Sequence, residues 1–561
     1  MLTEDLPEEN GAVTRPDLAL GPRNGAFPAS VNDVQRLRLL GHASASLAEV
    51  ETNCATIREA WCGSQETGSV LSEQRLVDRL VDVLRLAHQH VSRLAEYRAH
   101  WADAEDPFVS LADKVAVESA ILALVADRCA GDRALVRQWV GRLARSLEPH
   151  VRSSRNEIVI RRYPHSAMSL GIGHAALSSI GLPDPDFDRL VRQSLEKELA
   201  DCTERLPYRA MERRWLSGLL GVVPKPQFDD LLPLSIAARP GHPIYMLATD
   251  VYALTHAPMF MTDFGRLPME DNFPHGRCEE SLDATAAWVL HTDNFDLMGE
   301  LVLARVLLNT PWTTSHFLAW KTLEVAWDRL GFLACPSFAI QQFHELPAEE
   351  RSSYAFRHIY HTTYVAGMLC AALLRAPSED LHVRAPTSVM DDGLRDECRM
   401  AFEASMSFCA GGLDASRIDV AELAQVAGLR LQEPPLKAVH RLVSAWHSRN
   451  PGSSATVLSV LDHVDLPDSS LASSLADGLL TCSARAYDLS MLAQTLQVVV
   501  GTGLPVTTTV AAAARFLIRQ QLPNGTIGGW FLESESTSAS RASELTAALA
   551  APLGALSLYR E

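Results

Sequence analysis

The chain has 561 residues, of which 47% are hydrophobic and 21% charged, a composition typical of a globular protein rather than a disordered one. Its 68 acidic and 50 basic side chains give a formal charge of −18, which repels phosphate backbones and anionic lipid surfaces, so no nucleic-acid partner is expected. Its 10 cysteines include no Cys-x-x-Cys pair, and its first residues lack the basic and apolar regions of a secretory signal, so we expect a cytoplasmic protein with reduced thiols.

The chain divides into three predicted regions. Residues 1–30 are rich in Pro, Gly, Asn and acidic side chains without periodicity, so we expect a flexible tail. From residue 31 the apolar spacing becomes helical, as in residues 73–91, where Leu and Val recur every three or four positions opposite Arg, Asp and Gln. We assign residues 31–150 to an N-terminal helical region and residues 151–561 to a larger helical domain.

The larger region predicts many helices and no sheet. Apolar helical stretches alternate with short turns such as "GLPDPD", "ELPAEE" and "QLPNG", and no run shows the alternation of a strand. The pattern indicates an all-α protein of about twenty helices, and so long an antiparallel series favours an α/α solenoid or toroid over a single bundle. The longest apolar run, residues 364–374, is too short to cross a bilayer, so no membrane insertion is expected.

One turn resembles a motif of a known superfamily. In "RFLIRQQLPNGTIGGWF", Phe516, Gln520, Gly525 and Trp530 match the residue types of the glutamine-tryptophan turn in terpene cyclases and protein prenyltransferases, although the spacing from glycine to tryptophan is longer here. The resemblance implies an α/α toroid, a terpene cyclase-like barrel of paired helices, with an N-terminal helical extension. It does not extend to the catalytic acids of that superfamily, because the chain has neither a DxDD nor a DDxxD run.

A second resemblance covers roughly residues 160–380. The segments "TH…TDFG", residues 255–265, and "YHTT", residues 360–363, resemble an uncharacterised bacterial family. This resemblance implies no known activity.

The segment "YALTHAPMFMTDFG" places titratable groups in an apolar helix. Tyr252 and His256 lie four residues apart and share one face, and Pro258 predicts a break or kink just after them. A carbonyl group freed by that break would fix the tautomer of His256. If the chain bends there, Asp263 can approach His256; otherwise Asp263 is part of a helix terminator.

The segment "FRHIYHTTYVAGM" is the second candidate. His358 and His361 lie three residues apart, and Tyr360 and Tyr364 lie four apart, so imidazoles and phenols occupy adjoining faces of one helix. The half of the helix that follows is strongly apolar. The pattern indicates a helix with a polar end and an end in the core.

The segment "HTDNFDLMGE" contains Asp293, Asp296 and Glu300. We interpret it as a helix cap followed by acids in solvent.

Together the first two segments predict a catalytic cavity lined by Tyr252, His256, Asp263, Tyr360 and His361. Two imidazoles and a carboxylate suffice for a divalent metal with an open coordination position or, without metal, for a base oriented by an acid. The sequence does not decide between them. His256 and Asp263 are two helical turns apart, about 10 Å along an unbroken axis, which slightly favours the metal-free version. No other cofactor is assigned.

The expected function is that of a biosynthetic enzyme of specialised metabolism, of the cyclase, lyase or transferase kind. Its substrate would be an apolar small molecule or a peptide intermediate held in the central cavity. The alternative is a helical-repeat interaction protein that binds a partner in its concave face without catalysis. Convergence of His256, Asp263 and His361 inside a ring of helices would support the enzyme, and their dispersal over an open superhelix would support the alternative.

Overall fold

The computed structural model describes residues 72–97, 108–196, 204–224, 226–239, 241–270, 273–376, 383–410, 433–450, 455–461, 464–528 and 539–559. Within these ranges the protein is almost entirely helical, which confirms the all-α prediction. The tail predicted over residues 1–30, and Trp530 of the glutamine-tryptophan turn, lie outside them. None of the described helices is both long and apolar enough to span a membrane.

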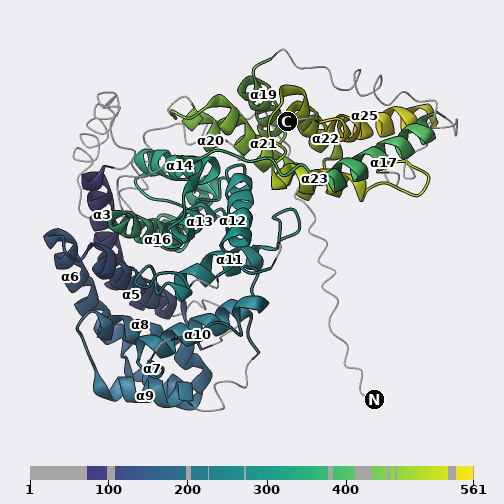
Figure 1. The fold of residues 1–561 in the computed structure, drawn as a ribbon. Coiled ribbons are helices and arrows are strands. Elements are labelled where there is room, and N and C mark those ends of the chain that lie inside the picture. The colour runs from purple at the N-terminus through teal and green to yellow at the C-terminus, as the bar shows by residue number, and fades with distance from the viewer. Residues whose placement is uncertain are drawn as a thin grey trace, which may run out of the picture.

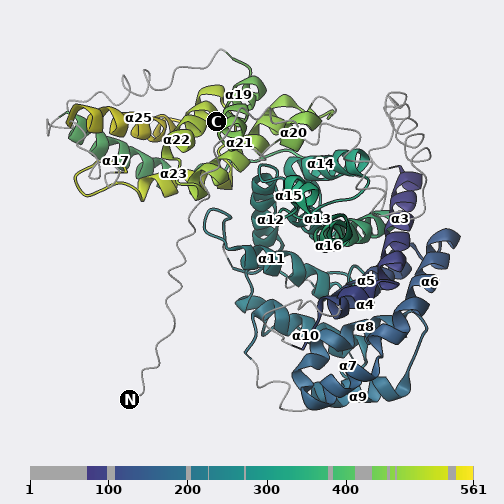
Figure 2. The same cartoon turned by 180° about the vertical axis from the view of Figure 1, so that it is seen from behind.

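The helices form an amino-terminal body, α3 to α16, and a carboxy-terminal lobe, α17 to α25, which lies beside it (Figures 1 and 2). The elements of the body are α3 (Glu73–Val91), α4 (Leu94–Tyr97), α5 (Leu111–Ala130), α6 (Ala134–Val151), α7 (Ser154–Arg162), η1 (Pro164–Ser166), α8 (Ala167–Ser179), α9 (Pro185–Glu196), α10 (Pro207–Leu219), η3 (Leu232–Leu234), α11 (Ala248–Met261), α12 (His275–Val289), α13 (Phe295–Leu307), β1 (Trp312–Thr313), α14 (Thr314–Leu330), α15 (Ile340–Glu345) and α16 (Ala348–Arg375). The elements that follow are β2 (Val383–Arg384), α17 (Asp392–Cys409), α19 (Pro435–Arg449), α20 (Ala455–Val460), α21 (Asp468–Arg485), α22 (Leu489–Thr502), α23 (Thr508–Ile518) and α25 (Ala539–Ser557).

Six helices of the body contact one another in a closed circuit, in the order α5, α8, α10, α11, α13, α16 and back to α5. Helices α3 and α6 pack against α5, and α3 also packs against α16. The circuit joins α5, which precedes residue 150, to helices that follow it, so packing crosses the predicted boundary between the first two helical regions. Helix α13 is buried along almost its whole length, as its apolar sequence "FDLMGELVLARVL" requires.

Local sequence signals explain where several of these helices begin. The hydroxyl of Ser110 accepts from the backbone N–H of Asp113, whose carboxylate accepts from the backbone N–H of Ser110, so a complete capping box starts α5. The side chain of Asn294 accepts from the N–H of Leu297 at 3.1 Å and starts α13. The apolar stripe predicted within residues 73–91 is buried in α3.

Helix α11 runs through Pro258, so the predicted break at this proline is wrong. The proline removes one N–H donor, while the residues on both sides of it are packed in the core, which holds the helical path. The helix ends after the next turn, where Asp263, Phe264 and Gly265 have φ angles of 49°, 52° and 85°. These left-handed conformations terminate the helix, with the N–H of Gly265 bonded to the hydroxyl of Thr262 at 3.1 Å.

The body and the lobe meet along α12 and α14. These helices contact α20, α21 and α23 of the lobe. The strand β2, which follows the body's last helix, pairs in parallel with β1 just before α14, with Thr313 opposite Arg384. One continuous cluster of buried apolar side chains extends through both parts, so the lobe and the body share a core.

The turn after α23 fixes that helix to α17. The side-chain amide of Gln521 donates to the carbonyl oxygen of Ala401 at 2.6 Å and to the hydroxyl of Ser405 at 2.8 Å. Gln520, which matches the glutamine of the glutamine-tryptophan turn, donates to its own helix at Phe516 at 2.9 Å and accepts from the hydroxyl of Tyr487 at 2.8 Å. The neighbouring glutamine therefore links the two helices.

Candidate functional site

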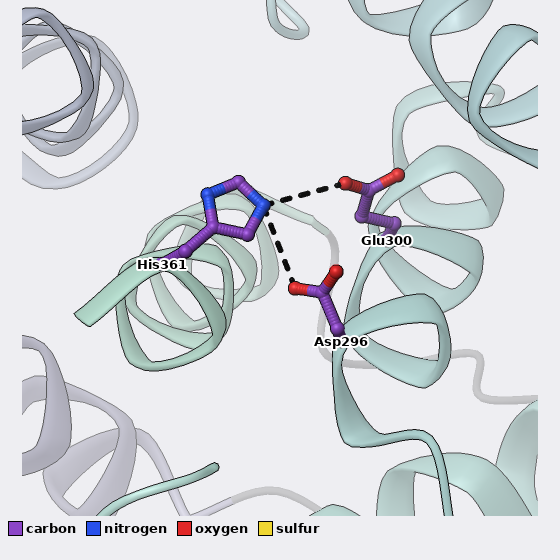
Figure 3. A group of neighbouring side chains, drawn as sticks. All are labelled: Asp296, Glu300 and His361. Atoms are coloured by element: carbon purple, nitrogen blue, oxygen red, sulfur yellow. Dashed lines mark ion pairs between the residues drawn. The ribbon is translucent and has the colours of Figure 1, made fainter. Parts of the chain in front are cut away.

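The candidate site is built on α13, whose Asp296 and Glu300 face His361 of α16 (Figure 3). The Nε2 atom of His361 lies 3.5 Å from Oδ1 of Asp296 and 3.9 Å from Oε1 of Glu300. One nitrogen or oxygen from each of the three residues lies within 4.8 Å of those from the other two. Asp296 and Glu300 occur four residues apart, so they share one face of the helix.

The interpretation of Asp296 and Glu300 as acids in solvent is wrong. Their exposed fractions are 5% and 2%. Helix α13 lies between α11, α12, α14 and α16 and therefore has no solvent face on which the acids could lie. An acid pair at helical spacing within an otherwise apolar helix is the sequence signal that identifies this site.

Glu118 of α5 completes the surroundings of His361. Its Oε2 accepts a hydrogen bond from Nδ1 of His361 at 2.8 Å, while Lys114 lies one turn earlier on α5 with its Nζ 3.8 Å from Oε1. Nδ1 carries the proton in this bond, and Nε2, the other nitrogen of the ring, faces Asp296 and Glu300. Glu118 was not among the predicted residues, and the only sequence signal for it is a single acid within the apolar part of α5.

Hydroxyl groups hold the two buried carboxyl groups in place. The hydroxyl of Tyr252 donates to Oδ2 of Asp296 at 3.1 Å, and that of Thr362 donates to Oδ1 at 3.2 Å. The hydroxyl of Thr255 donates to Oε2 of Glu300 at 2.6 Å. Side chains from α11 and α16 thus orient both oxygens of Asp296, and a side chain from α11 holds Oε2 of Glu300 and leaves Oε1 to face His361.

His256 lies next to Glu300 on the α11 side. Its Nδ1 donates to the carbonyl oxygen of Tyr252 at 2.8 Å and lies 3.6 Å from Oε2 of Glu300. The rings of Tyr208 and Phe260 both lie 5.8 Å from the imidazole. A backbone carbonyl thus orients His256, but it is that of Tyr252 within an unbroken helix and not the one that a break at Pro258 was expected to free.

Water reaches the two imidazoles but hardly the acids of α13. The side chains of His361 and His256 are 35% and 26% exposed, whereas those of Asp296 and Glu300 are 7% and 2% exposed. A molecule that enters the site therefore meets the histidines first.

The surroundings of the site raise the pKa values of His361 and Asp296 and lower the pKa of Glu300. Burial by itself disfavours a charged His361, but Glu118 and Asp296 outweigh it and raise the imidazole pKa well above its usual value. Burial and the neighbouring Glu300 raise the pKa of Asp296, although His361 opposes them. Burial also acts to raise the pKa of Glu300, but His256 and His361 together lower it. Three carboxyl groups thus surround one imidazole.

Asp263 does not join this group. Its Oδ1 accepts from Nε1 of Trp215 at 2.6 Å and pairs with Arg128 at 2.7 Å, and its Oδ2 accepts from Arg266 at 2.6 Å. None of its contacts within the described ranges is with His256 or His361. The expected convergence required a bend at Pro258, and the unbroken helix carries Asp263 into a separate, buried ion-pair network.

Tyr360 packs beside the site rather than into it. It is 4% exposed, and its ring lies 5.1 Å from that of Phe356 and 5.7 Å from that of Tyr364. Burial raises its pKa well above the usual value, with Glu118 adding to the effect. Of the five predicted residues, the structure brings together Tyr252, His256 and His361.

These features define an all-α protein with a buried acid–imidazole centre. The chain belongs to a family described as a domain of unknown function (DUF6895), whose model matches residues 80–371. That segment includes Glu118, His256, Asp296, Glu300 and His361. Neither the curated proteins nor the solved structures include a match to the chain.

Proposed function

We propose that this protein is an enzyme whose active centre is a divalent cation held by Asp296, Glu300 and His361. The observation that carries the proposal is the placement of His361, with Nδ1 bonded to Glu118 and Nε2 facing two buried carboxyl groups. A carboxylate that holds the far nitrogen of a ligating histidine is a recurrent feature of protein metal sites. The set of one imidazole and two carboxylates suits zinc, manganese or iron.

The distances support a cation between the three groups. Ligands lie about 2.0–2.2 Å from zinc, so two ligands of a tetrahedral site are about 3.3–3.6 Å apart. The separation of 3.5 Å between His361 and Asp296 falls in this range, and the 3.9 Å to Glu300 requires a closure of a few tenths of an ångström. Both separations are long for a direct hydrogen bond, so a cation between the groups would add to the compensation that the hydroxyls and imidazoles give the two acids.

His256 supplies an acid–base group next to this centre. With Nδ1 bonded to a backbone carbonyl, its Nε2 is the nitrogen available to accept a proton. The cation would polarise an oxygen of the substrate or of a bound water, and His256 would move the proton. We therefore propose a metal-assisted proton-transfer reaction. The sequence slightly favoured a metal-free base because it selected Asp263; the ligands on α13 reverse that preference.

The substrate proposed is an apolar or partly apolar small molecule or peptide intermediate, as in a biosynthetic enzyme. The partly exposed ring of Tyr252 beside His256 supports an apolar contact next to the polar centre, and the rings of Tyr208 and Phe260 are buried against the same imidazole. We also propose that the circuit of six helices is the inner wall of an α/α toroid, like that of terpene cyclases. The alternative, a helical-repeat scaffold, leaves a buried set of three acids and an imidazole without a role.

The test is metal binding by the whole purified chain. After removal of metal by chelation, calorimetric titration with Zn²⁺ and Mn²⁺ should show one site per chain, and Glu300→Gln should abolish it. Bound metal should raise the free energy of unfolding by about 2.7 kcal/mol at a hundredfold excess over Kd. Asp263→Asn is the matched control, a buried acid outside the site, and should keep the stoichiometry. If the metal-free protein binds neither ion, the proposal is wrong, and the hypothesis of a base that acts without metal takes its place.

A further inference from the structure

A polar cavity of about 210 Å³ lies where α12 and the start of α14 meet α21 and α23. Its wall combines residues of the body with residues of the lobe. Asp283, Arg305 and Thr314 come from the body, and Asp477 and Thr507 come from the lobe. None of the residues of the proposed metal centre lines it.

Two carboxyl groups line this cavity, and threonine hydroxyls hold both of them. Thr507 donates to Oδ1 of Asp477 at 2.7 Å, and Thr313 donates to Oδ1 of Asp283. Among the described side chains, no lysine or arginine lies within ion-pair distance of either acid. The nearest basic group, Nδ1 of His316, is 3.8 Å from Asp283, and burial lowers the pKa of that imidazole well below its usual value, so it is neutral.

The electrostatics of the two acids favour the entry of a cationic group. Burial raises the pKa of Asp477 to about 8, and the charge of Asp283 adds to the effect. Loss of solvation in the cavity wall also raises the pKa of Asp283, although its hydrogen bonds and the charges of Arg305 and Arg384 oppose the effect. A carboxyl group with a raised pKa holds its proton more tightly, so a cationic group entering the cavity would replace the proton of Asp477.

The cavity wall also offers donors that lack acceptors, although Nη2 of Arg305 lies 3.4 Å from Oε2 of Glu279. Arg305 is 1% exposed and Thr314 is 2% exposed, and both line the cavity. Nη1 of Arg305 and Oγ1 of Thr314 have no hydrogen-bond partner within the described part of the chain. Arg384 of β2 also lines the cavity and is exposed. A buried donor without an acceptor destabilises the folded protein, so a ligand that supplies the acceptor would bind favourably here.

We propose that this cavity binds a small zwitterion of the amino acid class. Its ammonium group would lie between Asp283 and Asp477, and its carboxylate would face Arg305 and Arg384. The volume of about 210 Å³ is below the range of about 300–1,000 Å³ found for drug-sized ligands, so the side chain of the ligand must be small. Because the two acids belong to α12 and α21, the ligand would join the body to the lobe. This proposal does not depend on the metal centre.

The test is calorimetric titration of the full chain at neutral pH with glycine, L-serine and L-alanine. Ethanolamine and L-lactate, which each carry only one of the two charged groups, are the comparison ligands. At least one amino acid should bind at one site per chain, and both comparison ligands should bind at least about tenfold more weakly. Asp477→Asn should weaken binding by a similar factor, whereas Asp468→Asn, at the exposed start of the same helix, should not change it.

Proton release provides a readout that a structural role would not change. Titrations in buffers of different ionisation enthalpy should show the native chain releasing a proton on binding, and Asp477→Asn releasing less. The other charged groups at this cavity are Glu279, Glu280, Asp283, Arg305 and Arg384, with the neutral His316 behind Asp283. Arg384→Ala changes an exposed residue, so it tests the carboxylate contact even if a buried variant fails to fold. No amino acid binding up to about 10 mM, or unchanged binding by both variants, would overturn the proposal.

Discussion

Glu118 and His361 are joined by a hydrogen bond of 2.8 Å between residues 243 positions apart in the sequence, one on α5 and the other on α16. The bond closes the circuit of helices at the candidate centre and decides which nitrogen of His361 faces the acids of α13. It also couples the two charges, since His361 lowers the pKa of Glu118 against the opposing effect of burial.

Glu118→Gln should weaken Zn²⁺ or Mn²⁺ binding by about 10–100-fold without abolishing it. The reason is that Glu118 orients the ligating imidazole without itself touching the cation. Calorimetric titration measures the change, and Glu157→Gln, which removes one partner of an exposed ion pair with Arg161, is the control. Equal affinities in Glu118→Gln and native protein would show that His361 does not bind the cation through Nε2.

Asp263→Asn should destabilise the protein by about 3–5 kcal/mol and leave metal binding intact. The substitution removes the charge that Arg128 and Arg266 pair with, and a buried arginine without its partner is costly. Thermal or urea unfolding measures the loss. A stable Asp263→Asn protein that has lost its metal would instead place this residue in the functional site.

The contribution of Asp477 to stability should fall as the pH rises from about 4 to about 8, so the native chain should gain more stability relative to Asp477→Asn at pH 4 than at pH 8. The pKa of Asp477 is raised to about 8 in the folded protein, so the native state holds this proton more tightly than the unfolded state does. The stabilisation is present at low pH and lost as the pH passes the folded value. Melting temperatures of both proteins across this range, without ligand, test the sign, and parallel curves would contradict it.

Gly525→Ala should be more destabilising than Gly503→Ala. Both glycines have left-handed backbones, with φ angles of 90° and 71°, so each substitution should cost about 1 kcal/mol for the backbone alone. A Cβ atom at Gly525 would lie 2.2 Å from the carbonyl oxygen of Ala404, whereas nothing lies within 4 Å at Gly503. The turn at Gly525 would have to shift away from α17. Equal melting temperatures for the two variants would argue against this close approach.

Local features of the site were predictable from the sequence. Tyr252 and His256 share a face of α11 because helical geometry places residues four apart together, and their rings lie 6.1 Å apart. The same geometry places Asp296 beside Glu300 on α13. The sequence also offered helix termination as one interpretation of Asp263, and the left-handed residues that follow α11 are that terminator.

Which acids surround His361 depends on the packing of helices that are far apart in the chain. The helical class and the residues that share each helix face could be predicted, because these depend on neighbours within a few positions. Glu118, Asp296 and His361 belong to three helices, and their contacts depend on how α5, α13 and α16 pack. Helical periodicity does not specify that packing, so it could not distinguish the ion-paired Asp263 from Asp296 and Glu300 of α13.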